Sequence, residues 1–348
     1  MKKIAFSLLF TTIFFAVNAQ FNSLKDPFII KTLTNESFEK INAETSHGSI
    51  SVSAVAAGEA RIEVYIRSNG RWDEKLSKEE IQERLDENYS LEVSVSGGVL
   101  SAIARQKKNF NIGKRALGIS FTIYTPQGVS ANLRSSHGNI FLSGVTGSQD
   151  VATSHGNLDL EKITGKITGE TSHGNISISG SPSEIDLGTS HGNIDAKNCE
   201  GAIKLVTSNG DIHLKALKGK TNAGTSHGNV TGDDITGDGL SATTSHGNVD
   251  LGNLSCSVQT STNHGNINLS FNQLVGSVTV DNSDGNISLQ LPKGKGIDLD
   301  LHAKGIRIDA MDNFSGSKDD KDMKGTLNGG GTAIKATTGK GTISLSFK

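Results

Sequence analysis

Histidine recurs at a regular spacing between residues 137 and 264, and it is the residue type here best suited to chemistry. Each copy lies in a His-Gly-Asn motif that is usually preceded by Ser, and the copies follow at steps of 18 or 19 residues, with one step of 36. Neutral imidazoles repeated at one slot could in principle bind Zn²⁺ or Cu²⁺. The repeated residues are His137, His155, His173, His191, His227, His246 and His264, with Asn139, Asn157, Asn175, Asn193, Asn229, Asn248 and Asn266 two positions later.

A structural corner explains the motif better than a metal site. Metal sites need ligands that converge and a supporting shell, whereas stacked repeats would hold their imidazoles parallel. In two repeats Asn209 and Asp284 occupy the position of the motif that His holds elsewhere, which we call the His slot. This indicates that the position serves the geometry of a turn and not metal coordination. We therefore expect Gly to supply a backbone conformation closed to other residues, and Asn to stack into an amide ladder between repeats. We expect no metal and no cofactor, and we expect acid to loosen this column because imidazolium charges would repel each other.

Two other chemistries are weakly represented. Calcium binding by nonapeptide repeats requires Gly-Gly-x-Gly-x-Asp in each half-repeat, and here Gly-Asn occurs once per repeat. A polysaccharide lyase or hydrolase needs paired carboxylates, or a carboxylate beside a basic group. Glu161-Lys162 and Asp233-Asp234 qualify by residue type, but solvated turns explain them better. We expect no enzymatic activity.

The apolar residues follow the same period and predict the elements that carry the motif. Hydrophobic residues three and five positions after most of these histidines alternate with polar ones, as in Ile176 and Ile178 or Ile194 and Ala196. Alternation with a period of two indicates strands with one inward face. One repeat cannot bury this face alone, but repeats stacked about 4.8 Å apart share a core. The sequence predicts an all-β fold, a parallel β-solenoid (β-helix) with coils of about 18 residues.

The ends of the chain differ from the regular repeats. Residues 1–19 resemble a secretory signal peptide, with Lys2 and Lys3 before a short apolar run. Residues 20–125 form a β-rich region with a short helix at 77–86, where Ser77 and Glu80 make a capping-box pattern. Residues 126–348 form the regular solenoid, with a charged loop insertion at about 311–331. We expect an exported protein that is not transmembrane after signal cleavage.

Charge and cysteine content exclude several classes. The net charge is −2 and the two cysteines cannot build a disulfide-rich scaffold or a four-thiolate zinc site. A nucleic-acid binder would show clustered basic residues, so we expect no nucleic-acid partner. Cys199 and Cys256 fall in inward registers three coils apart, about 14 Å at the stacking distance, beyond the reach of a disulfide. We predict two buried free thiols.

Three features together resemble the DUF4097 or toastrack family of adhesin-like bacterial proteins. They are the Lys-Glu-Glu-Ile-Gln-Glu-Arg-Leu helix at 78–85, the Ile-Ser-Phe-Thr-Ile-Tyr-Thr-Pro strand at 119–126, and the tandem Ser-His-Gly-Asn coils. The resemblance covers roughly residues 40–348. It implies a β-helical envelope domain with no established catalytic residues.

These observations lead to a functional expectation with two alternatives. We expect a non-catalytic envelope protein in the periplasm or at the cell surface, whose repeated Ser/Thr-His-Gly-Asn face makes multivalent contacts. The partner would be an envelope protein or a surface glycan. The first alternative is a periplasmic envelope-stress sensing or scaffolding module. The second is a polysaccharide-processing enzyme built on a β-helix.

Overall fold

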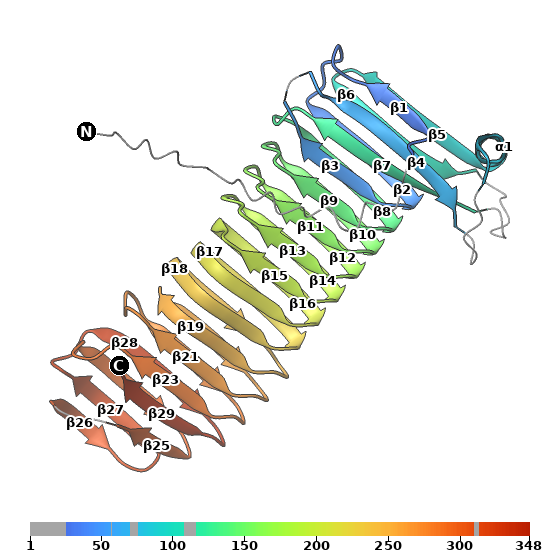
Figure 1. The fold of residues 1–348 in the computed structure, drawn as a ribbon. Helices are drawn as coiled ribbons and strands as arrows, with labels where there is room; N and C mark the ends of the chain where they lie inside the picture. Colours follow the sequence, from blue (N-terminus) through green and yellow to red (C-terminus); the bar gives the residue numbers. More distant parts are fainter. Residues whose placement is uncertain (1–25, 57, 70–75, 108–115, 310–312) are drawn as a thin grey trace, which may run out of the picture.

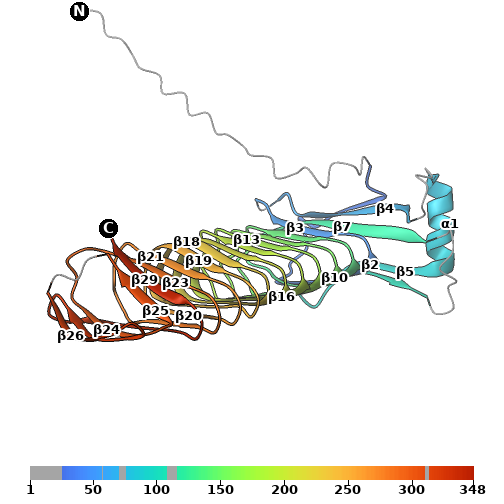
Figure 2. The same ribbon diagram turned by 90° about the horizontal axis from the view of Figure 1, so that it is seen from below.

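The computed structural model describes residues 26–56, 58–69, 76–107, 116–309 and 313–348. The chain folds into an elongated stack of short strands, with one helix at the end that holds the first strands (Figures 1 and 2). The expectation of an all-β fold with a short helix is confirmed. The predicted signal peptide at 1–19 lies outside the described residues.

The repeats contribute strands to two ladders that share one core. Strands of the first ladder end at the His position of the motif or two residues before it, and strands of the second begin three residues after it. The first ladder contains β8 (Ser130–His137), β10 (Gln149–His155), β12 (Ile167–His173), β14 (Ile185–His191), β16 (Glu200–Asn209), β20 (Val258–Thr262) and β22 (Val278–Asn282). The second contains β9 (Ile140–Ser143), β11 (Leu158–Glu161), β13 (Ile176–Ser179), β15 (Ile194–Lys197), β19 (Val249–Ser255), β21 (Ile267–Phe271) and β23 (Ile287–Leu291). The longer β17 (Ile212–His227) and β18 (Val230–Thr243) pass through both.

Pairing within each ladder is parallel, and it aligns equivalent residues of successive repeats. Ile167 of β12 lies opposite Ile185 of β14, and His173 lies opposite His191. Inward residues such as Ile176 and Ile194 are fully buried, and their alignment makes a continuous row of branched side chains. Burial of each such side chain stabilises the fold by about 1.5–3 kcal/mol. The 18-residue period of the sequence is therefore also the period of the strand register.

Segments from the beginning of the chain are inserted one layer inside the stack. The strands β2 (Lys40–His47) and β3 (Ile50–Ala54) pair on one side with β8 and β9. On their other side they pair with β6 (Val99–Gln106) and β7 (Leu117–Thr125). Antiparallel strands complete this end: β4 (Arg61–Ser68) pairs with β7 and with β1 (Ile29–Thr32), and β5 (Tyr89–Ser96) pairs with β6.

The single helix of the described residues, α1 (Lys78–Asn88), begins with the capping box expected from the sequence. The Ser77 side chain accepts a hydrogen bond from the backbone N–H of Glu80, and the Glu80 carboxylate accepts one from the backbone N–H of Ser77. Both bonds satisfy amide donors that a helix start leaves unpaired. Ile81 and Leu85 are buried and fix the helix against the end of the stack.

The C-terminal strands are also inserted one layer inside. The strands β28 (Thr332–Thr338) and β29 (Thr342–Phe347) lie between β22 and β23 on one side and β24 (Ile297–His302) and β25 (Gly305–Ile308) on the other. Figure 1 shows this end with β26 (Phe314–Lys318) and β27 (Asp322–Leu327) beyond the regular coils.

The expectation of a charged loop at about 311–331 is wrong for the described residues of that segment. They form a hairpin of β26 (Phe314–Lys318) and β27 (Asp322–Leu327), and β27 pairs antiparallel with β24. Met323 and Leu327 are buried while Asp322 and Lys324 are exposed. Among the charges that suggested a loop, Asp322 and Lys324 lie on the outer face of an amphipathic strand, whereas those of residues 319–321 lie in the hairpin turn.

Candidate functional site: the histidine corner

The predicted histidines form a stacked column along one corner of the fold, which we call the corner column. Neighbouring rings are parallel within 3° and their centroids are 4.7–4.9 Å apart, the spacing that the strand ladder imposes. These rings are exposed. The column consists of His137, His155, His173 and His191, then His227, His246 and His264.

His47 extends this column, which the spacing of the regular repeats did not reveal. Its ring stacks on His137 with centroids 4.7 Å apart, because β2 pairs directly with β8. The motif Thr45-Ser46-His47-Gly48 is visible in the sequence. It is separated from the regular repeats, however, and its spacing did not predict that it would lie beside them.

The column is interrupted and ended by other polar residues. Asn209 lies between His191 and His227 in the register. At the far end, the His264 ring nitrogen is 3.5 Å from the Asp284 carboxylate, which in turn contacts the Lys340 ammonium at 3.0 Å. Ion pairs between exposed groups stabilise a fold little. The effect of these contacts is therefore to place charged groups at the surface where the row of imidazoles ends.

The corner glycines are required by close approach of the backbone, not by the dihedral angle that we expected. At Gly174 a Cβ would overlap the carbonyl oxygen of Gly156, and at Gly192 it would overlap that of Gly174. The same overlap recurs at each regular corner, and the φ angles of these regular corner glycines are not in the left-handed region. Only a residue without a side chain fits between coils stacked this closely.

The asparagine column binds the backbone, which corrects the expected amide-to-amide ladder. The Asn157 Oδ1 accepts a hydrogen bond from the Asn175 backbone N–H at 2.9 Å, and the Asn175 Oδ1 accepts one from Asn193 at 2.8 Å. Asp211 takes the slot in one repeat, accepting from the backbone N–H of Asn229 at 2.7 Å. Each bond joins two successive repeats and satisfies a turn amide. The remaining predicted members follow the same pattern: Asn139, Asn229, Asn248 and Asn266 accept from the next repeat.

The residue two positions before each His forms a further ladder that sequence reasoning missed. The Thr189 hydroxyl donates to the Gly174 carbonyl at 3.0 Å, and the Thr171 hydroxyl donates to that of Gly156 at 2.9 Å. These Thr side chains are buried. The threonines therefore cannot offer outside contacts, contrary to the expected Ser/Thr face. The exposed groups of the corner are the histidines and the serines directly before them, such as Ser172 and Ser190.

Burial distinguishes His47 from the rest of the column. Desolvation, and secondly the proximity of His137, lower the pKa of His47 from its ordinary value. Its Nδ1 is buried without a hydrogen-bond partner. The neutral ring is therefore the favoured form in the folded protein.

The carboxylates considered as catalytic candidates lie at a turn after the second ladder. Lys162 and Asp234 both adopt left-handed conformations there, with φ of 51° and 58°. The same slot in other repeats holds Gly144, Gly180, Asn198, Ala216 and Asn253, also with positive φ. Turn geometry accounts for both pairs. Within the described ranges, no group of three or more His, Cys, Asp or Glu side chains is placed to hold a metal ion.

Both cysteines are buried and free, as predicted. Burial raises the pKa of the Cys256 thiol to about 11 and also raises that of Cys199. Such thiols are poor nucleophiles. They therefore belong to the core and not to a reactive site.

The family model described as Toastrack DUF4097 matches residues 180–346, so the resemblance expected from the sequence is confirmed over that part of the chain. A search of curated proteins finds no match. In the part of the chain that the structure describes, no helix has the length and apolar character needed to cross a membrane.

Three solved structures are similar over most of their length. A proposed adhesin from Bacteroides fragilis is 15% identical, with 92% of this chain and 96% of that chain covered and a TM-score of 0.25. One from Parabacteroides distasonis is 12% identical, with 91% and 96% covered and a TM-score of 0.28. A proposed cell adhesion protein from Clostridium sporogenes is 11% identical, with 92% and 98% covered and a TM-score of 0.22. These scores are too low for the similarity to assign a role to this chain.

Proposed function

We propose, from the premise that residues 180–346 belong to the toastrack DUF4097 family, that this chain is an exported, non-catalytic β-solenoid with an adhesin-like role in the cell envelope. Its contacts would be multivalent and individually weak. The corner column would be the surface that makes them.

The parallel registers support a solenoid of about 18-residue coils. Residues 18 positions apart face each other in both ladders, as Gln149 faces Ile167 and Leu158 faces Ile176. Each coil is joined to the next by backbone ladders and by the Asn and Thr bonds of the corner. A stack held in this way presents its outer side chains in a fixed, repeating geometry.

The exposed, evenly spaced His rings carry the proposal. Rings 4.7–4.9 Å apart place equivalent donors and acceptors in a straight row. A partner with its own repeated groups would bind several members at once, and the effective concentration of each later contact would be high. A row of parallel rings offers no converging ligands for a metal and no pair of groups for acid–base catalysis, which favours binding over chemistry.

The first test is where the chain lies. Intact cells that produce it are treated with protease, with and without permeabilisation, and the chain is then detected. Degradation in intact cells is the expected result. Protection until permeabilisation would overturn the adhesin-like role and favour the alternative of a periplasmic sensing or scaffolding module.

The second test is whether the corner binds. We expect the triple variant His155→Gln, His173→Gln, His191→Gln to lose about tenfold or more of the binding of the purified chain to the producing cells. The control is a triple change on the second ladder of the same coils, Ser177→Ala, Asp195→Asn, Lys197→Gln, which should bind as the wild type does. Equal binding by both variants would show that the corner is not the contact surface.

A further inference from the structure

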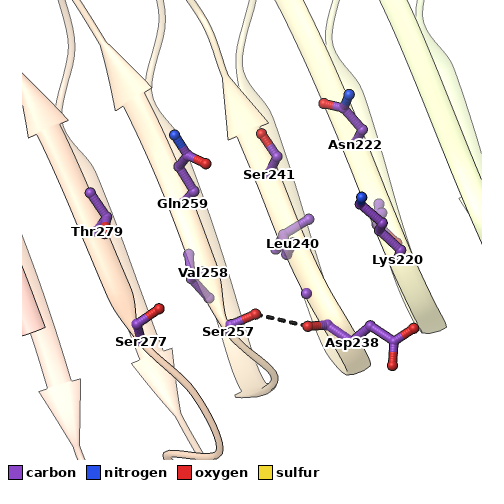
Figure 3. Close-up of a pocket in the computed structure, with 12 residues that line it drawn as sticks. Lys220, Asn222, Asp238, Leu240, Ser241, Ser257, Val258, Gln259, Ser277 and Thr279 are labelled. Atoms are coloured by element: carbon purple, nitrogen blue, oxygen red, sulfur yellow. Dashed lines mark hydrogen bonds between the residues drawn. The ribbon is translucent and has the colours of Figure 1, made fainter. Parts of the chain in front are cut away.

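A polar groove crosses the first ladder on a surface separate from the corner. Its volume is about 430 Å³, and it extends over β17, β18, β20 and β22. Figure 3 shows its side chains in two rows that run across the strands. One row contains Asn222, Ser241, Gln259 and Thr279, which are aligned by the parallel register. The other contains Lys220, Asp238, Ser257 and Ser277.

The second row has a gap at one position, where the residue is a glycine and has no side chain. Gly239 lies opposite Lys220 in the ladder, and the row continues through Ser257, which is small. The Ser257 hydroxyl donates to the Asp238 carbonyl at 2.8 Å. The two rows therefore flank a channel with the strand backbones as its floor.

Most of the polar groups in this groove have no partner in the part of the chain that the structure describes. Within the described residues, the side chains of Asn222, Gln259 and Thr279 make no hydrogen bond or ion pair, and the same holds for Lys220, Ser241 and Ser277. Amide and hydroxyl groups arranged in this way can donate and accept at each step of the ladder. The groove is therefore a row of available hydrogen-bonding groups.

The same two rows are different in the preceding coils. There, Lys204 pairs with Asp186 at 3.1 Å, and Lys166 pairs with Glu184 at 2.8 Å. Lys204 lies directly opposite Asn222 in the register. In the preceding coils, therefore, the rows hold long charged side chains that bind each other. At the groove they hold mostly neutral side chains, and most of these bind no other described residue.

The chemistry of the groove indicates a neutral, hydroxyl-rich ligand. Lys220 and Asp238 contribute opposite charges, so the groove has no excess positive charge to attract a polyanion. The strand backbones at its floor are already paired in the ladder, which leaves no free edge for an added peptide strand. The groups that remain are suited to hydroxyls spaced about 4.8 Å apart, a step close to that of the rings in an extended saccharide chain.

We propose that this groove binds a segment of an uncharged polysaccharide that runs along the stack. The site is independent of the corner column, and it adds a ligand class that the proposed function does not specify. Binding through a few net hydrogen bonds in a shallow groove would be weak, with a Kd on the order of 1 mM for a short oligosaccharide.

Calorimetric titration of the full chain tests the proposal. The probes are cellohexaose and maltohexaose as neutral hexasaccharides, and a hexamer of galacturonic acid as an acidic one. We expect at least one neutral probe to bind and the triple variant Asn222→Ala, Gln259→Ala, Thr279→Ala to weaken it by more than about tenfold, since each lost hydrogen bond costs about 2- to 10-fold. The control variant Thr168→Ala, Ser177→Ala, Asp195→Ala should bind as the wild type does, and thermal melts verify that all variants are folded.

Several results would overturn the proposal. These are no binding of either neutral probe at about 10 mM, binding of the acidic probe alone, or equal affinity in the wild type and the groove variant. The corner variant His155→Gln, His173→Gln, His191→Gln should bind the neutral probe normally. If it loses cell binding while no saccharide binds, the corner function stands and the groove proposal fails.

Discussion

The rings of His47 and His137 are stacked 4.7 Å apart and parallel within 1°, although 90 positions separate them in the sequence. The contact exists because β2 is inserted beside β8, ahead of all the regular coils. The corner column therefore begins in the N-terminal region. The isolated copy of the motif in the sequence is therefore the first member of the corner column.

Replacement of a corner glycine should destabilise the stack strongly. In Gly174→Ala the new Cβ would overlap the Gly156 carbonyl, and the coils would have to separate. We expect a loss of about 3 kcal/mol or more in the free energy of unfolding, measured by urea denaturation. Gly188→Ala in the same repeat is the control, because its Cβ would lie 3.6 Å from the Val206 oxygen, an ordinary contact. Equal losses in the two variants would contradict the close-approach explanation.

The buried hydroxyls of the corner should contribute to stability and not to binding. Thr189→Val keeps the shape but removes the donor to the Gly174 carbonyl. We expect a loss of about 1 kcal/mol with unchanged binding to cells. Thr168→Val, on the exposed side of β12, should have little effect on unfolding. A binding defect in Thr189→Val without a change in stability would mean that these threonines are accessible after all.

The left-handed turn column offers a stabilising substitution. Ala216 has a φ of 51°, a conformation that costs a residue with a Cβ about 1 kcal/mol. Ala216→Gly should therefore raise the free energy of unfolding by a few tenths to about 1 kcal/mol. The reverse change at the same slot, Gly180→Ala (φ 63°), should lower it by a similar amount. Destabilisation by Ala216→Gly, or stabilisation by Gly180→Ala, would refute the role of the turn conformation.

Acid should destabilise the fold partly through His47. Burial and His137 lower the pKa of His47 below its ordinary value of 6.5. The unfolded chain therefore takes up a proton before the folded chain does, so the stability is fully present above about pH 6.5 and is lost as the pH falls toward the folded pKa. His47→Gln should reduce the decrease in unfolding free energy between about pH 8 and about pH 5.5. His173→Gln, which removes an exposed ring of the same column, is the control; an equal reduction in both variants would assign the effect to stacking in general.

Much of the fold could be predicted because the repeat imposes the same packing problem in each coil. Period-two alternation identified inward residues such as Ile176 and Ile178, which are buried. The hairpin of β26 and β27 was missed because Met323 lies between charged residues and Leu327 precedes a glycine-rich turn, and only the pairing with β24 gives them a buried face.

The corner was identified by its residue types, but the forces within it were not. The recurring glycine suggested that the corner needs a backbone conformation closed to other residues. The actual cause is the short distance between successive coils, which is a property of the tertiary structure and cannot be read from a single repeat. The Thr ladder was missed for the same reason, because the acceptor of Thr189 is the carbonyl of Gly174 in the preceding coil. The groove at Asn222 and Gln259 depends on which side chains become neighbours in the register.

Placement of the last strands one layer inside the stack has a mechanical consequence. When the chain is pulled from its C-terminus, β29 is loaded first, and it is hydrogen-bonded on one side to β23 and on the other to β25. Extraction must shear two ladders together, whereas a strand at the outer edge could be peeled from one. We expect the C-terminal strand to resist extraction better than the last strand of an equal stack whose final coil was its outermost one.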